Sequence, residues 1–239
     1  MSPGDAHAIK GPLRTLAAGS LDGDTWLVGW FAQPDGSGVV IVAAGAAPQV
    51  LEAQLDDDWG LRAAGVALEV QEAGDPVPLG GDEEPAGGFE QPIEVTLGAV
   101  QLAGRRGERD DLRGSLDSVR ELSAWFGPGQ TIAVNAARPR KHKGHESDSV
   151  RAGVAEPQGT AAIVDARLST TYAADGRPIR VGLELWSDDE DRAAIRLSAE
   201  ARGTVVQASQ AGWELTATPL RCHREDVTGA GVYLLARPS

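Results

Sequence analysis

Turn-forming residues divide this chain into short apolar segments, and that spacing constrains the fold more than any other feature. Turn signals stand at Asp22-Gly23, Asp35-Gly36, Gly127-Pro128-Gly129 and Asp175-Gly176. Asp-Gly suits tight hairpins, because Gly reaches positive φ values at no steric cost. Many short apolar segments separated by such turns predict an all-β chain of antiparallel meanders, arranged as a barrel or as a two-lobed sandwich or barrel.

Helical signals are weak by comparison. The best helical candidate is Asp110 to Glu121, where Leu112, Leu116 and Val119 recur at roughly helical spacing, although Gly114 disfavours a helix there. A loop or a single turn is the alternative for this segment. The expected strands cover most of the remaining chain: 13–20, 24–32, 38–44, 49–55, 61–71, 93–102, 120–126, 130–137, 149–155, 160–165, 167–174, 177–186, 194–202, 204–209, 212–218 and 231–236.

Two breaks suggest how the chain is organised. A length of 239 residues suits one large all-β domain or two small lobes. Residues 74–92 are rich in Gly, Pro and acidic residues, and residues 105–119 are densely charged. We therefore expect an N-terminal β lobe over 1–104, a charged link over 105–119 and a C-terminal β lobe over 120–239.

The charge balance argues against whole classes of partner. The chain has 22 Lys and Arg against 35 Asp and Glu, which gives a formal net charge of -13. Such a surface repels nucleic acid and anionic membranes, so neither is expected as a partner. The longest apolar stretch, Val39 to Ala47, is too short to span a bilayer, and no membrane insertion is expected. The oligomeric state is left open.

Cysteine use and the first residues predict the compartment. Cys222 is the single cysteine, so no disulfide forms within the chain, which suits a reducing cytoplasm. The start of the sequence, Met1 to Asp5, lacks the basic and then apolar run of a signal peptide. A cytoplasmic protein is expected.

One strand is apolar on both faces. In 25–31, Trp26, Val28 and Trp30 point one way, while Leu27 and Phe31 point the other, because side chains alternate along a strand. Such a strand needs cover on both sides. It lies between two sheets, or in a barrel whose inside is apolar and whose outside meets another lobe. The inside is then either a ligand cavity or a filled core.

Six tryptophans against three Phe and two Tyr are an unusual aromatic balance. Large, rigid indoles line apolar ligand pockets well, and they also fill ordinary sandwich cores. The tryptophans taken as candidates for contact with a ligand are Trp26, Trp30, Trp125 and Trp186.

A basic segment follows the expected strand 130–137. Its cations, with Arg138 and Arg140 foremost, could hold a phosphate or carboxylate through charge-assisted hydrogen bonds, and His145 is a further candidate for ligand contact. The alternative is an exposed hairpin loop over 138–145. The spacing of its His and acidic residues matches no zinc motif, so neither a metal nor another cofactor is expected.

His223 and Glu225 share a strand face and could form an acid/base pair, although a solvated strand face is the more common reading of such a row. Cys222 points to the other face and suits a small core residue better than a nucleophile. No nucleophile elbow and no Gly-rich phosphate loop follows a strand. The usual hydrolase, kinase and dinucleotide-binding signatures are therefore absent from the sequence.

Three segments resemble, in this order, motifs of the lipocalin-like double-barrel proteins: Gly104 to Asp110, Ser123-Ala124-Trp125 and Gly182 to Trp186. That group includes the carotenoid hydratases and the tocopherol-cyclase-like proteins, in which a charged Gly-Arg-His segment ending in Ser-Trp-Gly lies between two β-meanders. This chain has no His in the charged segment, and Phe126 follows Trp125. Its part from Arg167 to Trp186 is also similar to uncharacterised actinobacterial proteins.

The resemblance implies a lipocalin-like barrel that binds a small apolar metabolite and acts on it as a cyclase, isomerase or hydratase. Such chemistry needs an acid in an apolar cavity, where loss of solvation raises its pKa. Glu108, Asp110 and Glu184 are the candidates by resemblance only. The alternatives are a binding or accessory protein without catalysis and a structural sheet protein without a ligand.

The register of one hairpin can be predicted residue by residue. Asp175-Gly176 as a two-residue turn pairs Tyr172 with Ile179, Thr170 with Val181 and Leu168 with Leu183. The next hairpin then pairs Val181 with Ala199, Leu183 with Leu197 and Leu185 with Ile195. On the opposite face this register aligns Arg167, Glu184 and Arg196, which gives Glu184 a structural use.

Overall fold

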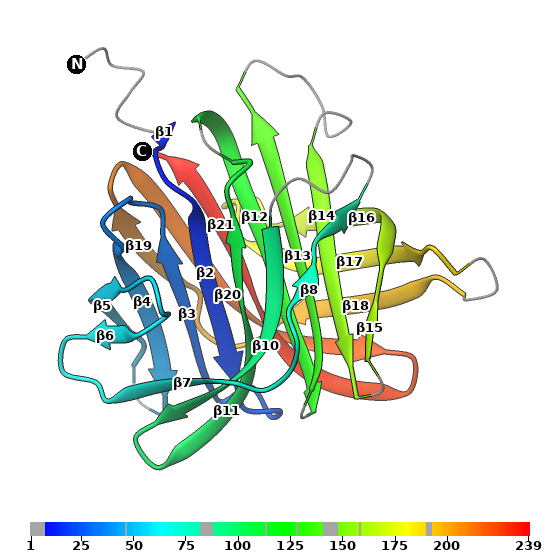
Figure 1. The fold of residues 1–239 in the computed structure, drawn as a ribbon, viewed down its shortest axis with the longest axis horizontal. Coiled ribbons are helices and arrows are strands. Elements are labelled where there is room, and N and C mark those ends of the chain that lie inside the picture. Colours follow the sequence, from blue (N-terminus) through cyan, green and yellow to red (C-terminus); the bar gives the residue numbers. More distant parts are fainter. Residues whose placement is uncertain are drawn as a thin grey trace.

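The chain folds into two antiparallel sheets, and the computed structural model describes residues 8–45, 47–81, 88–112, 114–127, 129–140, 148–157, 159–189 and 193–239. The first sheet, in the spatial order β6-β5-β4-β3-β2-β11-β10-β7 with β8 beside β10, is drawn in blue to green in Figure 1. Its strands are β2 (Leu13–Gly19), β3 (Thr25–Phe31), β4 (Ser37–Ala44), β5 (Gln49–Leu55), β6 (Leu61–Ala63), β7 (Leu68–Glu72), β8 (Val77–Pro78), β10 (Gly88–Leu97) and β11 (Val100–Arg109).

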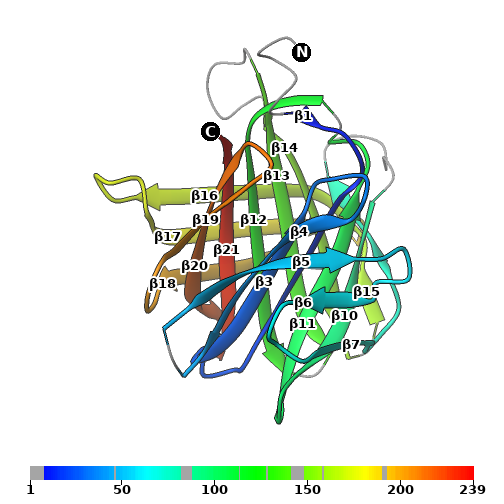
Figure 2. The ribbon, with the colours of Figure 1, turned by 90° about the vertical axis from the view of Figure 1, so that its left-hand side faces the viewer.

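The second sheet has the order β15-β14-β13-β12-β21-β20-β18-β17-β16, with β1, β9 and β19 paired beside it. In Figure 2, β16 and β17 run across the direction of β12 and β21, because each sheet curls into a nearly closed barrel. Its strands are β1 (Ala8–Ile9), β9 (Gly80–Gly81), β12 (Gly114–Gly127), β13 (Gln130–Pro139), β14 (Ser149–Glu156), β15 (Gly159–Ala161), β16 (Ile163–Tyr172), β17 (Pro178–Ser187), β18 (Ile195–Ala201), β19 (Val206–Gln210), β20 (Trp213–Arg224) and β21 (Val227–Pro238).

The all-β prediction is confirmed, and the described ranges contain no helix. The helix considered for Asp110 to Glu121 is wrong. The alternative of a loop or a single turn is correct only for residues 110–112, which form a turn, because Gly114–Gly127 forms strand β12. Leu116 and Val119 are buried there by packing between the sheets, which outweighs their helical spacing. Within 105–119, residues 105–109 complete β11 and residues 114–119 begin β12, so the charged residues are largely parts of strands.

Apolar side chains form three separate cores. The inside of the first barrel is filled by a cluster around Leu16, Leu27 and Phe31. The inside of the second barrel is filled by a cluster around Leu183 and Tyr233. A third cluster joins the outer face of the first barrel to the second sheet and includes four of the six tryptophans, Trp26, Trp30, Trp125 and Trp213.

The doubly apolar strand β3 lies in the wall of the first barrel. Trp26, Val28 and Trp30 face the second sheet, while Leu27 and Phe31 face the barrel interior. The expectation of a barrel whose outside meets another lobe is therefore confirmed for this strand. The barrel interior beside it is packed with apolar side chains.

The predicted register of the second barrel is confirmed except for the pairs next to the turn at Asp175-Gly176. Arg167 lies opposite Glu184, Leu168 opposite Leu183 and Thr170 opposite Val181. Across β17 and β18, all three predicted apolar pairs occur, together with Glu184 opposite Arg196.

The pair between Tyr172 and Ile179 is wrong, because Tyr172 lies opposite Pro178. The turn has one residue more than predicted: Ala173 N–H donates to the Arg177 carbonyl, and Gly176 has a φ of 81°. A left-handed Gly closing a three-residue loop is typical of hairpins with a bulge. The register shift between Thr171 and Tyr172 restores the predicted pairing beyond it.

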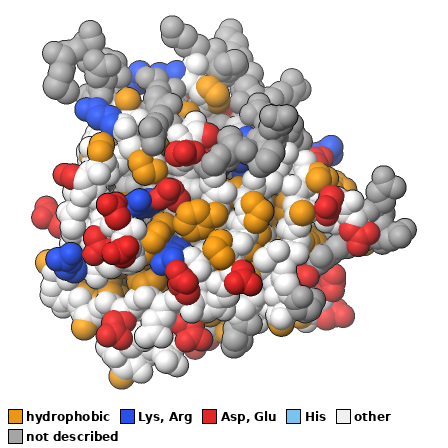
Figure 3. All heavy atoms as spheres, viewed as in Figure 1, with side chains coloured by type: hydrophobic (Ala, Val, Ile, Leu, Met, Phe, Trp, Pro, Cys, Tyr) orange, Lys and Arg blue, Asp and Glu red, His pale blue; other side chains and the backbone are white. Residues whose placement is uncertain are grey.

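Acidic side chains are spread over the face shown in Figure 3, where basic side chains are fewer. This agrees with the excess of 35 acidic over 22 basic residues. In the part of the chain that the structure describes, no helix is long and apolar enough to cross a membrane.

Candidate functional site

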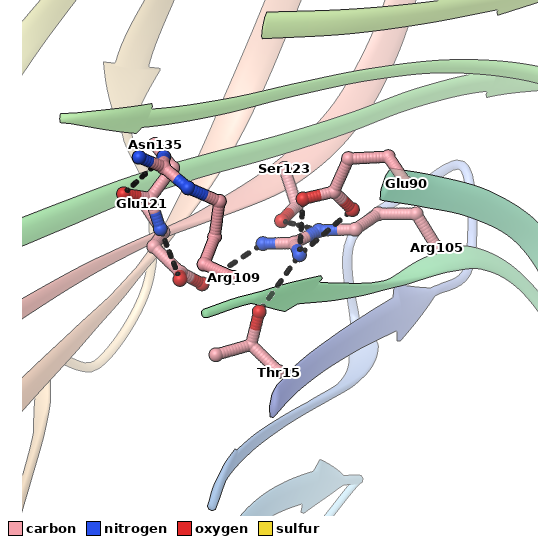
Figure 4. Close-up of polar contacts among 7 residues, drawn as sticks. All are labelled: Thr15, Glu90, Arg105, Arg109, Glu121, Ser123 and Asn135. Carbon is pink, nitrogen blue, oxygen red and sulfur yellow. Dashed lines mark hydrogen bonds and ion pairs between the residues drawn. The ribbon is translucent and has the colours of Figure 1, made fainter. Parts of the chain in front are cut away.

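A cluster of charged and polar side chains is buried between the two sheets (Figure 4). We call it the interface cluster, and it consists of Thr15, Glu90, Arg105, Arg109, Glu121, Ser123 and Asn135. Each of these residues is at most 5% exposed. Buried charges are costly unless they are paired and hydrogen-bonded, so the partners of each group are informative.

Arg105 lies at the centre of the interface cluster and uses all of its guanidinium nitrogens. Its Nη1 donates to both carboxylate oxygens of Glu90 at 3.1 and 3.0 Å, and also to Thr15 Oγ1 at 2.9 Å. Its Nη2 donates to Glu121 Oε2 at 3.0 Å, and its Nε donates to Ser123 Oγ at 2.6 Å. Arg105 therefore links two strands of the first sheet to strand β12 of the second.

A second arginine continues the network along the interface. Asn135 Nδ2 donates to Glu121 Oε1 at 2.6 Å, and Arg109 Nη1 donates to Asn135 Oδ1 at 3.1 Å. Arg109 also binds the two carboxylate oxygens of Asp111, at 2.6 and 2.5 Å. Arg151 Nε lies 3.6 Å from one of these Asp111 oxygens. Three arginines thus face three carboxylates across this part of the interface.

The alternation of side chains along β10 and β11 explains why Glu90, Arg105 and Arg109 all point into the interface between the sheets. Arg105 and Arg109 point to the same face of β11 as Gly107, and Glu90 lies directly opposite Gly107 on β10. A Cβ at Gly107 would lie 2.3 Å from Glu90 Oε1, and one at Gly153 on β14 would lie 3.3 Å from Glu90 Cβ. The two glycines therefore provide the room in which the Glu90 side chain lies between the sheets.

Glu90 is the described carboxylic acid whose pKa is most strongly shifted. Burial raises the pKa of its carboxyl to about 7, and the nearby Glu121 adds to the effect while Arg105 opposes it. A carboxyl group with such a pKa exchanges a proton near neutral pH. That is the property expected of a general acid or base in an enzyme.

A groove follows the seam between the two sheets beside the interface cluster. One part has a volume of about 250 Å³, and the adjoining part has about 560 Å³. Ala73, Pro92 and Gly129 line both parts, so we treat them as one feature and call it the interface groove. Pocket volumes of roughly 300–1,000 Å³ are typical of small-molecule sites.

The interface groove and the interface cluster lie on the same faces of the same strands. Pro92 follows Glu90 by two residues on β10, and Ala103 precedes Arg105 by two residues on β11. Side chains two residues apart on a strand point to the same face. The Glu90–Arg105 pair therefore lies next to the groove wall, inside the interface.

Trp125 is the predicted ligand-contact residue that lies nearest the interface groove. It is fully buried, and its indole Nε1 donates to the carbonyl of Ser20 at 3.2 Å. A Cβ at Gly19 would lie 2.4 Å from the Trp125 ring, so the indole packs directly on the backbone of Gly19. Gly19 and Ser20 both line the groove, and Trp125 forms the layer behind them.

Trp26 and Trp30 lie in the core between the sheets and do not line the groove themselves, although Trp26 pairs with the lining residue Gly19. The Trp30 ring packs on Trp213, with ring centroids 6.0 Å apart. Trp186 lies on the outer face of the second barrel, where the Arg167 guanidinium covers its ring at 4.9 Å. The four tryptophans singled out in the sequence therefore do not line one common pocket.

The three predicted acids are not brought together. Glu108 accepts a hydrogen bond from Arg14 Nε at 2.5 Å, on the face of β11 opposite to Arg105 and Arg109. Asp110 is exposed after the end of β11. Glu184 pairs with Arg196 at 3.0 Å on the outer surface of the second barrel.

The basic segment is only partly described. Arg138 lies at the end of β13 and binds Asp148, whose side chain is 1% exposed and also binds Arg120 at 2.5 Å. Asp148 raises the pKa of the Arg138 guanidinium by hydrogen bonding. Arg140 is exposed, and His145 lies outside the described residues. The beginning of this segment is thus anchored to a buried carboxylate.

Two further features of the sequence have clear positions. Cys222 faces the core of the second barrel, and burial raises the pKa of its thiol to about 12, which fits a small core residue. His223 lies on the outer face of β20 and contacts Thr228 Oγ1 through Nδ1 at 3.2 Å. Among the described residues, no group of three or more His, Cys, Asp and Glu side chains is placed to hold a metal ion.

Sequence reasoning did not single out Glu90, Arg105 or Glu121. Arg105 lies within the charged motif that carries the resemblance, in which Glu108 and Asp110 are the predicted acids. Glu121 and Ser123 alternate with the buried Leu122 and Ala124, which resembles a strand with one solvated face. The missing information was that a second sheet covers that polar face.

Comparison with known proteins bears on the fold. No protein-family profile and no curated protein matches the sequence. Among solved structures, CghA with Sch210972 aligns over 98% of this chain and 89% of that chain, with a TM-score of 0.65 and 11% identity. The AttH candidate protein of Nitrosomonas europaea aligns over 98% and 95%, with a TM-score of 0.56 and 9% identity.

This chain shares its fold with these proteins. A second structure of CghA gives the same result, with a TM-score of 0.63 at 10% identity over 95% of this chain and 88% of that chain. The likeness is one of architecture, and it confirms the lipocalin-like double barrel that the sequence motifs predicted.

Proposed function

We propose that this protein binds a small, largely apolar metabolite in the interface groove. The observation that carries the proposal is the groove itself, which combines apolar lining such as Leu21, Pro92 and Ala103 with the buried Glu90–Arg105 pair close behind its wall. Small-molecule sites typically join apolar walls to a few fixed polar groups. CghA, which shares the fold, was solved with Sch210972.

Binding is tested by titrating the protein with retinol, farnesol and hexadecanol while tryptophan fluorescence is recorded. Trp125 packs against Gly19 in the groove lining, so a bound ligand is expected to change its emission in a saturable way. The variant Ala73→Trp places a bulky ring where both parts of the groove meet, at an exposed position. It is expected to weaken binding at least tenfold.

Ala174→Trp is the matched control, because Ala174 is exposed in the turn between β16 and β17, among no residues that line the groove. It should bind the probes as the unchanged protein does. The proposal fails if none of the three probes gives a saturable response, or if Ala73→Trp binds as tightly as Ala174→Trp.

A catalytic role of the cyclase, isomerase or hydratase type is the second candidate, and the pKa of Glu90 favours it. An acid that still holds its proton near pH 7 could protonate a double bond or a leaving group. In this hypothesis Glu90 is the proton donor, and Arg105 orients its carboxyl group through two hydrogen bonds.

Mass spectrometry of the compounds that copurify with the protein separates the two candidates. An enzyme is expected to carry product, whereas its Glu90→Gln variant retains unconverted substrate of different structure. If the protein only binds its ligand, the unchanged protein and the Glu90→Gln variant carry the same compound. Glu184→Gln, on the outer surface, is the control that should match the unchanged protein.

A further inference from the structure

A second groove crosses the outer face of the second barrel, on strands β16, β17, β18 and β20, which Figure 1 shows in yellow to orange. We call it the outer groove. It has a volume of about 620 Å³, and the opposite face of the same strands is packed against the barrel core. It shares no lining residue with the interface groove, so it is a separate feature.

The floor of the outer groove is a row of aligned residues, one from each strand. Ser169 lies opposite Gly182, Gly182 opposite Ser198, and Ser198 opposite His223. Neighbouring strands lie roughly 4.8 Å apart, so the row extends about 14 Å across the sheet. The floor offers hydroxyl groups and an imidazole. Leu168, Leu183 and Leu197 also line the groove, but they alternate with the floor residues and their side chains pack in the core of the second barrel.

Longer charged side chains border this floor on both sides, and they form ion pairs between neighbouring strands. On one side, Glu184 binds Arg196 at 3.0 Å. On the other side, Arg180 binds Glu200 at 2.9 Å, on strands β17 and β18. The borders therefore present both hydrogen-bond donors and hydrogen-bond acceptors. Each pair is neutral as a whole, because one arginine balances one glutamate.

The two ends of the outer groove add recognition groups. At one end, His223 contacts Thr228 through Nδ1, which leaves Nε2 as the imidazole nitrogen not used in that contact. Glu225 lines the groove beside it. At the other end, Arg167 lines the groove and lies over the half-buried Trp186 ring at 4.9 Å. A ligand that contacts Arg167 would therefore alter the surroundings of Trp186.

These features select among classes of ligand. The leucines that line the groove face the barrel core, so they offer an apolar ligand little surface. The lining balances Glu184 and Glu225 with Arg167 and Arg196, which favours neither a polyanion nor a polycation. A polyhydroxylated ligand suits the groove, because its hydroxyl groups both donate and accept hydrogen bonds. On the protein side the arginines of the borders donate, the glutamates accept and the serines of the floor do both. We propose that the outer groove binds a neutral oligosaccharide, lying across the strands along the floor.

The first experiment screens the full chain against an array of neutral and acidic glycans, followed by calorimetric titration of each oligosaccharide that binds. Saturable binding of at least one neutral oligosaccharide is expected. Gly182→Trp fills the floor, where a Cβ would meet only the end of the Ser169 side chain, and it should weaken that binding at least tenfold. Ser198→Trp, at an exposed floor position, provides a second blocking variant if Gly182→Trp does not fold.

Val164→Trp is the matched control, because Val164 is 48% exposed on β16 and does not line the groove. It should bind the oligosaccharide as the unchanged protein does. Ala73→Trp, which blocks the interface groove, should also leave this binding unchanged, so the two proposals fail separately. The inference is overturned if no neutral glycan binds, if only acidic glycans bind, or if a folded floor variant binds as well as Val164→Trp.

Discussion

At the scale of single residues, Glu90 makes the stability of this protein depend on pH in an unusual direction. Its pKa is raised from 4.5 to about 7 in the folded protein. Between these values the folded state holds a proton that the unfolded state has lost, so the free energy of unfolding falls as pH rises, by about 3 kcal/mol in total. Urea unfolding at pH 5, 6, 7 and 8 measures this slope.

Glu90→Gln removes the titrating group while keeping the size of the side chain, and it should flatten the slope between pH 5 and 7. Glu184→Gln changes an acid whose side chain is 43% exposed, and it should keep the slope. An unchanged slope in Glu90→Gln would show that another group causes the pH dependence. The low pKa values of Asp22, Asp35 and Asp175, held down by hydrogen bonds, affect stability only at more acidic pH.

At the scale of elements, alternation along β17 separates residues that stabilise the fold from residues that do not. Leu183 is 2% exposed in the core of the second barrel, and Leu183→Ala should lower the free energy of unfolding by about 2–5 kcal/mol. Glu184 is its neighbour on the outer face, and Glu184→Ala should change it by less than about 1 kcal/mol. Chemical unfolding of the two variants makes the comparison, and similar losses would contradict the assignment of faces.

The same alternation explains how much of each element the sequence could predict. The pairing of β16, β17 and β18 followed from apolar residues on one face and complementary charges on the other, since a slip of one residue reverses both. The extra residue in the turn at Asp175-Gly176 was missed, because two- and three-residue turns share this dipeptide. The segment at Asp110 to Glu121 was misread, because Leu112, Leu116 and Val119 mimic helical spacing by chance.

At the scale of the whole molecule, the contacts between the two sheets could not be predicted from the sequence. Thr15, Glu90 and Arg105 come from three neighbouring strands of the first sheet, and Glu121 meets them only because the two barrels pack in one particular orientation. Nothing local distinguishes Glu90 from the exposed Glu94 on the same strand. The doubly apolar strand β3 did predict that a second layer covers the first barrel, but not which polar groups face it.

The core between the sheets implies that the two barrels unfold as one unit. Trp26, Trp30, Trp125 and Trp213 belong to this core, so most of the tryptophan fluorescence reports on contact between the barrels, whereas far-UV circular dichroism reports on all strands. Both signals should follow one coincident transition in urea. Trp30→Ala should lower the free energy of unfolding by about 3–5 kcal/mol, because it leaves a cavity beside Trp213. The fluorescence and circular dichroism transitions should move together to lower urea concentration. If fluorescence changed first and circular dichroism later, the barrels would be separately stable, and the buried arginines and carboxylates would not be needed to fold either one.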